Sequence, residues 1–344
     1  MHVPDGFFNA AVSLSAGVVA AAGVAVCLRG ARRELDDRTA PMAGLVAAFV
    51  FAVQMLNFPV AAGTSGHLLG GTLAAILVGP YTAVLCVAVV LLVQGFFFAD
   101  GGLTALGVNI TLMGVVAVVV GWTVFRLITR AVRNRGAVVA ASFVAALVSV
   151  PATALAFTLL FWIGGTAPIE VGTVAAAMGG VHVLIGIGEG LITAVTVSTV
   201  LAIRPDLVYG ARGLAAPLVL RGAGGDAVVT QEAPAPAPAA ARRPGWFLPA
   251  GIVVAALLAG IVSFYASSSP DGLERVAEDK GFISQATDHA LGEQPLADYG
   301  DAGGIPVGVA GLIGVGVTLA VGGGLFFAVR RRTKDGTVKD EVSA

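Results

Sequence analysis

The stretch from residue 40 to residue 99 contains no Asp, Glu, Lys or Arg. Such a stretch is long enough to cross a lipid bilayer more than once, because a helical span needs about 20 residues. Over the whole chain 57% of residues are hydrophobic and 12% are charged, about half the charged share of an ordinary soluble domain. The sequence therefore excludes a soluble globular protein and predicts an all-α polytopic membrane protein.

Apolar runs between charged or turn-forming residues divide the chain into predicted helices, and 344 residues leave room for roughly nine spans. Residues 68–78 are too few for a full span, so we expect a short or half-inserted helix that is buried in protein or lines a cavity. An N-terminal bundle of about seven helices, this short one included, is predicted over residues 7–28, 41–60, 68–78, 81–98, 103–126, 138–163 and 171–203. A C-terminal unit of two helices is predicted over residues 246–266 and 304–329.

The basic residues predict how the spans are oriented. Arginines cluster within residues 29–33, 126–135 and 330–332, and such clusters mark the cytoplasmic side of a membrane. The N-terminus and the acidic segment 267–303 are then outside, and the C-terminus is cytoplasmic. We expect a multi-pass protein of the cell (inner, cytoplasmic) membrane, with the lipid bilayer and no nucleic acid as a partner. No Lys or Arg precedes the first apolar run, so we expect no cleavable signal peptide and a retained Met1 amine.

Composition changes sharply after residue 215. Residues 216–245 include the run Ala-Pro-Ala-Pro-Ala-Pro and no periodic apolar pattern, which predicts a semi-rigid cytoplasmic linker. The predicted organisation is therefore a membrane domain over 1–215, this linker, a two-span domain over 246–332 and a cytoplasmic tail over 333–344.

The chain begins Met-His-Val-Pro-Asp-Gly, with a histidine at position two. The amine of Met1, the backbone nitrogen of His2 and Nδ1 of His2 can close two adjacent chelate rings on one metal ion. Nitrogens in a square plane favour Ni(II) or Cu(II). A fourth nitrogen can come from His67, in the Gly-Thr-Ser-Gly-His hairpin that the span order places on the same outer face. The alternative is that both histidines are solvated loop residues.

The same span order brings further polar residues to the outer face. They are candidates to hold the metal ligands by hydrogen bonds, with ordinary helix capping as the alternative: Asp5, Gln94, Asp100 and Asn109. His182 and Glu189, seven residues apart, share one face of the last helix of the bundle. They could pair inside the bundle, contact a partner subunit, or act as acid and base in an intramembrane enzyme; structural packing is favoured.

Four motifs resemble the CbiM/NikM family, the substrate-binding membrane components of energy-coupling factor (ECF) transporters for cobalt and nickel. They are Met-His-Val-Pro-Asp-Gly at 1–6, Gly-Thr-Ser-Gly-His-Leu-Leu-Gly-Gly at 63–71, Phe-Ala-Asp-Gly-Gly-Leu-Thr-Ala-Leu-Gly-Val-Asn at 98–109 and Gly-Glu-Gly-Leu-Ile-Thr at 188–193. The resemblance covers residues 1–215. Pro-Asp-Gly-Leu-Glu at 270–274 resembles the small CbiN/NikN component, fused here through the linker.

The resemblance implies a function. Met1, His2 and His67 would bind Co(II) or Ni(II) outside the cell, and a transmembrane coupling (T) subunit with cytoplasmic ATPase (A) subunits would drive uptake. The chain contains no Walker-type phosphate loop, so we expect ATP hydrolysis by these separate subunits and no enzyme activity here. A membrane metal sensor that uses the same site without transport is the alternative. The sequence does not decide whether the transported ion is cobalt or nickel. No cofactor is expected beyond that ion.

Overall fold

The protein is described by a computed structural model over residues 1–61, 63–214, 220–221, 227–228, 245–297 and 304–342. Seven helices in these ranges are long and apolar enough to cross a membrane. The described strands are two antiparallel pairs of two residues each, β1 (Phe58–Pro59) with β2 (Ser65–Gly66) and β3 (Leu220–Arg221) with β4 (Ala227–Val228). The prediction of an all-α polytopic membrane protein is confirmed.

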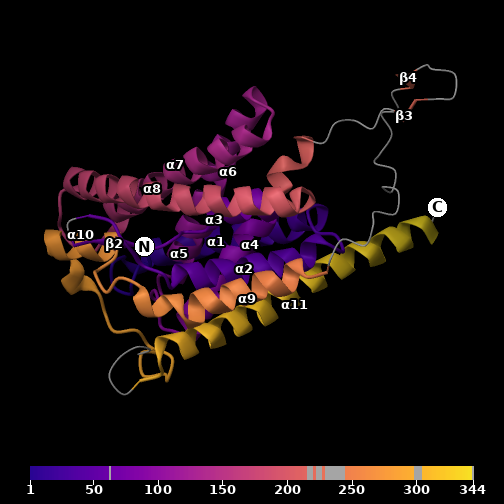
Figure 1. The fold of residues 1–344 in the computed structure, drawn as a ribbon. Coiled ribbons are helices and arrows are strands. Elements are labelled where there is room, and N and C mark those ends of the chain that lie inside the picture. The colour runs from indigo at the N-terminus through magenta and orange to yellow at the C-terminus, as the bar shows by residue number, and fades with distance from the viewer. Residues whose placement is uncertain (62, 215–219, 222–226, 229–244, 298–303, 343–344) are drawn as a thin grey trace.

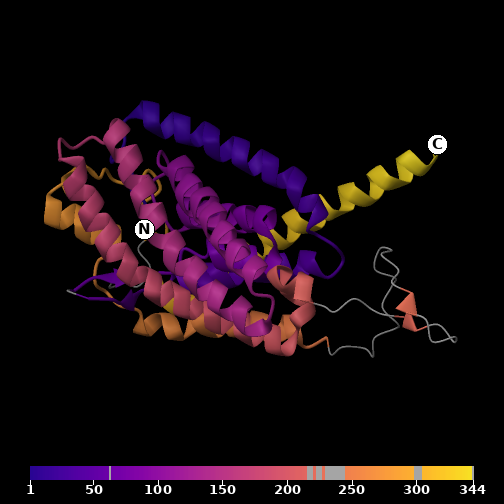
Figure 2. The same ribbon diagram turned by 90° about the horizontal axis from the view of Figure 1, so that it is seen from above.

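The N-terminal bundle contains eight α-helices, most of which run along a common direction (Figure 1). Their bounds are α1 (Ala10–Gly30), α2 (Thr39–Gln54), α3 (Gly71–Val78), α4 (Pro80–Phe97), α5 (Leu106–Asn109), α6 (Ala117–Ala131), α7 (Arg135–Gly164) and α8 (Val171–Ile203). A π-helical segment, Ile110–Val116, joins α5 to α6. These three segments together form one membrane-length helix over residues 106–131, shifted from the predicted span over residues 103–126. Seen from above, α1 lies along one flank of the bundle (Figure 2).

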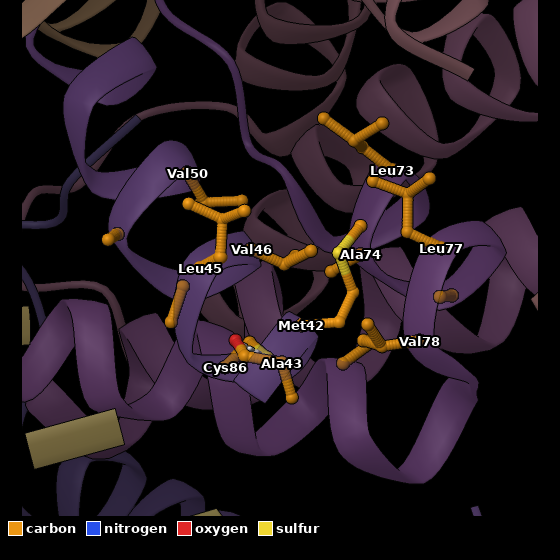
Figure 3. Packing of buried hydrophobic residues seen from close by; sticks show 14 of the residues in the cluster. Met42, Ala43, Leu45, Val46, Val50, Leu73, Ala74, Leu77, Val78 and Cys86 are labelled. Carbon is orange, nitrogen blue, oxygen red and sulfur yellow. Dashed lines mark hydrogen bonds between the residues drawn. The ribbon is translucent and has the colours of Figure 1, made fainter. Parts of the chain in front are cut away.

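The short helix α3 lies at the centre of the bundle, and all eight of its residues are buried. It begins after Gly70, whose φ of +81° is in the left-handed region that favours glycine. It packs against α2 through apolar side chains, and the Cys86 thiol of α4 donates to the Ala43 carbonyl (Figure 3). The prediction of a short helix at 68–78 is confirmed, and protein surrounds it as a membrane requires.

The predicted second span, residues 41–60, is too long at its C-terminal end. Helix α2 ends at Gln54, and residues that were expected to continue it form the β1–β2 hairpin instead. The hairpin turns the chain back into the bundle, so that α3 can enter from the same end. Roughly nine spans were expected. Seven of the described helices have the length and composition of a span, and the other two predicted spans correspond to the shorter helices α2 and α3.

The C-terminal unit consists of α9 (Phe247–Gly260), α10 (Gly272–Lys280) and α11 (Val307–Val342), with 3₁₀ turns at Val262–Tyr265 and Ile283–Gln285. Helices α9 and α11 lie beside α2 (Figure 1). Glycines allow the close approach: a Cβ at Gly251 would lie 2.4 Å from Leu45, and one at Gly44 would lie 3.1 Å from Gly323. Small residues are typical of such membrane-helix interfaces.

Within the acidic segment 267–303, for which no secondary structure was predicted, residues 272–280 form a helix. Asp271 and Glu274 form a capping box, in which each side chain accepts from the other residue's backbone amide, and α10 starts there. Of the predicted linker 216–245, only residues 220–221, 227–228 and 245 lie within the described ranges.

Candidate metal centre

The N-terminal residues lie inside the protein, at the end of the bundle where α8 begins (Figure 1). Asn109 of α5 clamps the backbone of Val3 on both sides: its Oδ1 accepts from the Val3 amide at 2.8 Å, and its Nδ2 donates to the Val3 carbonyl at 3.1 Å. The amide of Gly102 donates to the same carbonyl. The chain end is therefore held in one position by hydrogen bonds that do not depend on its own side chains.

Asp5 fixes the loop that covers the N-terminal segment. Its carboxylate accepts hydrogen bonds from the backbone amides of Leu103 and Thr104, at 3.1 and 2.7 Å, and from the Thr104 hydroxyl. Its backbone carbonyl accepts from the amide of Thr287 in the C-terminal unit. Asp5 thus ties the N-terminus to the loop before α5 and to the other unit.

The Met1 amine contacts the Nε2 atom of His67, across 66 positions of sequence. His67 follows the hairpin strand β2, and its Nδ1 lies 3.1 Å from the carbonyl oxygen of Leu68. Because that oxygen can only accept, Nδ1 carries the proton and the Nε2 lone pair faces the amine. Hydrogen bonding at one ring nitrogen is the usual way in which a ligating histidine is oriented.

His2 lies beside this pair. Its ring stacks on that of His67 with centroids 4.8 Å apart, its Nε2 lies 3.2 Å from Gln94 Oε1, and its Nδ1 lies 3.3 Å from Asp100 Oδ1. Burial lowers the pKa of His2 to about 4, although the Asp100 carboxylate opposes the shift. The imidazole is therefore neutral near pH 7 and retains a nitrogen lone pair.

The structure thus brings together all seven residues predicted for the site and its surroundings. It does not pair His182 with Glu189. Glu189 accepts from the amides of Leu69 and Gly70, directly after His67. His182 Nδ1 donates to the Met178 carbonyl at 2.8 Å, and its buried Nε2 has no hydrogen-bond partner among the described residues.

Sequence reasoning missed Asp271, the residue that caps α10. Its Oδ2 lies 2.9 Å from the Met1 amine and 3.6 Å from His67 Nε2. Burial raises the pKa of the Asp271 carboxyl, but the charge of the Met1 ammonium outweighs that effect and holds the pKa well below its usual value. The Asp-x-x-Glu pattern at 271–274, which is typical of a helix start, was the available signal.

The donors gathered here include main-chain nitrogen. Within the described ranges no group of three or more His, Cys, Asp or Glu side chains is arranged to hold a metal ion. The Met1 amine and the backbone nitrogen of His2 are further nitrogen atoms that lie beside the two imidazoles. Nitrogen donors of this kind suit Ni(II), Cu(II) and neighbouring divalent ions.

The sequence model of the CbiM family, described as the cobalt uptake substrate-specific transmembrane region, matches residues 2–207. The chain belongs to the CbiM family. A PDGLE domain matches residues 245–331, so that a CbiM region and a PDGLE region occur in one polypeptide. The resemblance stated from the motifs is confirmed, and the chain is a multi-pass membrane protein.

Named relatives of this CbiM-family chain are metal transport proteins. The fused nickel transport protein NikMN of Rhodobacter capsulatus is 35% identical over 63% of this chain and 66% of its own length. The cobalt transport protein CbiM of Sorangium cellulosum is 35% identical over 60% of this chain and 94% of its own length. A crystal structure of a truncated transition metal transporter is 28% identical, with a TM-score of 0.53 over 59% of this chain and 99% of that one.

Proposed function

We propose that this protein is the substrate-capture subunit of an ECF-type ABC importer for Co(II) or Ni(II). The observation that carries the proposal is the contact between the buried Met1 amine and His67 Nε2. Two nitrogen donors from distant parts of the chain meet there, next to a second imidazole. The kinship with cobalt and nickel transport proteins supports the choice of cargo.

The ligands in this proposal are the Met1 amine, the backbone nitrogen and Nδ1 of His2, and Nε2 of His67. In the structure Nδ1 of His2 faces Asp100, so the His2 ring must turn toward the amine when the cation binds. Gln94 and Asp100 hold the ring in its present orientation, while Asp5 and Asn109 hold the backbone that carries it. These four residues are proposed to position the ligands without binding the ion.

The remaining parts of the transporter lie outside this chain. A transmembrane T subunit and cytoplasmic A subunits are proposed to couple ATP hydrolysis to reorientation and release. The basic clusters at 29–33, 126–135 and 330–332 support a cytoplasmic location for the end of the bundle opposite the site. The metal would then be captured on the extracytoplasmic face of the cell membrane.

The terminal amine gives the proposal a direct test. The detergent-purified full chain with its native N-terminus is compared with the same chain carrying one extra residue before Met1, both tagged at the C-terminus. The extension converts the amine into an amide and forces a residue into a buried position, so Ni(II) and Co(II) binding should be lost. Equal affinity in the two proteins would show that the ion binds elsewhere.

Transport is tested separately from binding, because a membrane sensor could use the same site. Cellular accumulation of Ni(II) and Co(II) is measured with the T and A subunits present and with an A subunit unable to hydrolyse ATP. The proposal expects uptake only with the active ATPase. Tight binding without any ATPase-dependent uptake would favour a receptor or sensor.

A further inference from the structure

Asp271 uses its two carboxylate oxygens for different purposes. Oδ1 accepts from the amides of Leu273 and Glu274, at 2.7 and 2.9 Å, and so caps α10. Oδ2 takes no part in the cap and lies 2.9 Å from the Met1 amine and 3.6 Å from His67 Nε2. Since the cap fixes the orientation of the carboxylate, Oδ2 is directed at two atoms that are proposed above to bind the transported ion.

The segment before α10 is fastened to the hairpin that carries His67. The Ser65 hydroxyl donates to the carbonyl of Ser269 at 2.7 Å, and the Ser65 amide donates to the carbonyl of Pro270 at 2.9 Å. Ser65 stands two positions before His67, so the same hairpin places both the imidazole and the carboxylate. The relative position of these two groups is therefore set by hydrogen bonds and not by chance proximity.

Gly272 permits this approach. A Cβ at position 272 would lie 2.6 Å from Ile185 Cδ1 and 3.1 Å from His182 Cε1, both on α8. Beyond α10, the Phe282 ring packs edge-on against Phe7, with centroids 5.2 Å apart. The C-terminal unit therefore contacts the bundle both before and after Asp271 in the sequence.

A cavity of about 350 Å³ lies between the two units beside Asp271. His2, His67 and Asp100 line it from the N-terminal bundle, and Asp271 and Glu274 line it from the C-terminal unit. The cavity is large enough for a divalent cation with several of its water molecules, given that a water occupies about 30 Å³ in the liquid. Three carboxylates at its walls favour a cation over a neutral or anionic occupant.

We infer that Asp271 is itself a ligand of the transported cation, so that the binding site is completed by the C-terminal unit. The inference rests on the proposed function and adds an oxygen donor to its nitrogen set. A divalent ion bound to the Met1 nitrogen and His67 Nε2 would lie next to Oδ2, which is 2.9 Å and 3.6 Å from those two atoms. Mixed nitrogen and oxygen coordination is well suited to divalent ions of this series.

The experiment uses the full chain in detergent, with a native N-terminus, loaded with CoCl₂ or NiCl₂. D271N is the test variant, because Asn is also a good helix cap and has nearly the same shape. E278Q is the matched control, since it removes one carboxylate from the exposed face of the same helix. The measurements are the d–d absorption spectrum of bound Co(II) and the rate of Ni(II) loss to EDTA.

We expect D271N to change the Co(II) spectrum and to speed Ni(II) loss by at least about 10-fold, the scale seen even for groups that only support metal ligands. D271E, which keeps the carboxylate on a longer side chain, should return the spectrum toward that of the unmodified protein. E278Q should match the unmodified protein in both measurements. Circular dichroism and size-exclusion chromatography of D271N check that the variant is folded.

Three negative results have different meanings. If the unmodified protein binds Ni(II), and the one-residue extension abolishes binding, but folded D271N has the same spectrum and dissociation rate, then Asp271 is not a ligand and only this inference fails. If the extension leaves binding intact, the proposed function loses its site, whatever D271N does. A changed D271N spectrum that D271E does not restore would also contradict direct coordination by a carboxylate.

Discussion

Glu189 Oε2 accepts a hydrogen bond from the backbone amide of Leu69 at 2.7 Å, inside the bundle and two positions after His67. Its other oxygen lies 3.3 Å from the amide of Gly70, the residue that precedes α3. One buried carboxylate on α8 thus satisfies two backbone donors at the start of the short helix. These donors have no intrahelical partner, and in a membrane protein they cannot turn to solvent.

We predict that E189Q weakens Ni(II) affinity by about 10- to 100-fold, the range found for residues that support metal ligands. Gln keeps one acceptor oxygen but directs an NH₂ group at one of the two backbone amides, so the loop after His67 must shift. Isothermal titration calorimetry of purified protein measures the effect. T193V is the control, because Thr193 is buried on the same helix and its hydroxyl has no hydrogen-bond partner among the described residues. An E189Q affinity equal to that of T193V would show that Glu189 does not position His67.

Replacement of the two site histidines should have larger effects. H2A removes the imidazole of the proposed chelate and should abolish high-affinity binding of Ni(II) and Co(II). H67A should weaken binding by more than about 100-fold, the upper end of the range for supporting residues. Equilibrium dialysis with metal analysis checks both, with H289A as a histidine control from the C-terminal unit. Tight binding by either H2A or H67A would contradict the ligand assignment.

The loop that covers His2 depends on a glycine. Gly101 has φ +80°, and a Cβ there would lie 2.9 Å from Asn109 Nδ2 and 3.3 Å from His2 Cβ. G101A should therefore lower metal affinity, through displacement of Asn109 and His2 in addition to about 1–2 kcal/mol of left-handed backbone strain. G281A provides the comparison, since Gly281 has φ +79° and no atom within 4 Å of its Cβ position. If both variants lose stability equally and keep full metal affinity, the contact with His2 is unimportant.

Metal affinity should increase with pH. The lowered pKa of His2, about 4, means that this imidazole is already neutral at pH 7 and competes with protons only in stronger acid. The amine and the His2 backbone nitrogen must each lose a proton on binding in the proposed site, so the apparent affinity should rise by about 10- to 100-fold per pH unit near neutrality. Calorimetry in buffers of different ionisation enthalpy counts the protons released. Binding without proton release would exclude coordination by deprotonated backbone nitrogen.

Much of the site was predictable because its donors have unusual chemistry or simple topology. A histidine at position two is a chelating pattern by itself, and the order of the spans was enough to place Met1 and His67 at the same end of the bundle. The short helix α3 followed from the glycines at 70–71 and the Gly79-Pro80 pair. None of these predictions required knowledge of side-chain packing.

Long-range contacts decide the outcomes that the sequence pattern predicted wrongly or left open. The apolar residues after Gln54 are compatible with more helix, but pairing of Phe58 with Gly66 makes them a hairpin. Pairing of Glu189 with His182 was one of the alternatives that the sequence left open, since both lie on one helical face. Instead, the amides of Leu69 and Gly70, which are distant in sequence, donate hydrogen bonds to the Glu189 carboxylate, because buried N–H groups are costly to leave unpaired.

The sequence by itself determined that this chain is helical, crosses a membrane, belongs with cobalt and nickel transport proteins and begins with a histidine at position two. These properties depend on composition, periodicity and local motifs. Only the tertiary structure decided that Asp271 lies beside Met1 and His67, because that contact depends on how the C-terminal unit packs against α8 at Gly272 and bonds to the β1–β2 hairpin at Ser65. Hydropathy carries no information about such a contact, since Asp271 reads as an ordinary loop residue until the two units are packed together.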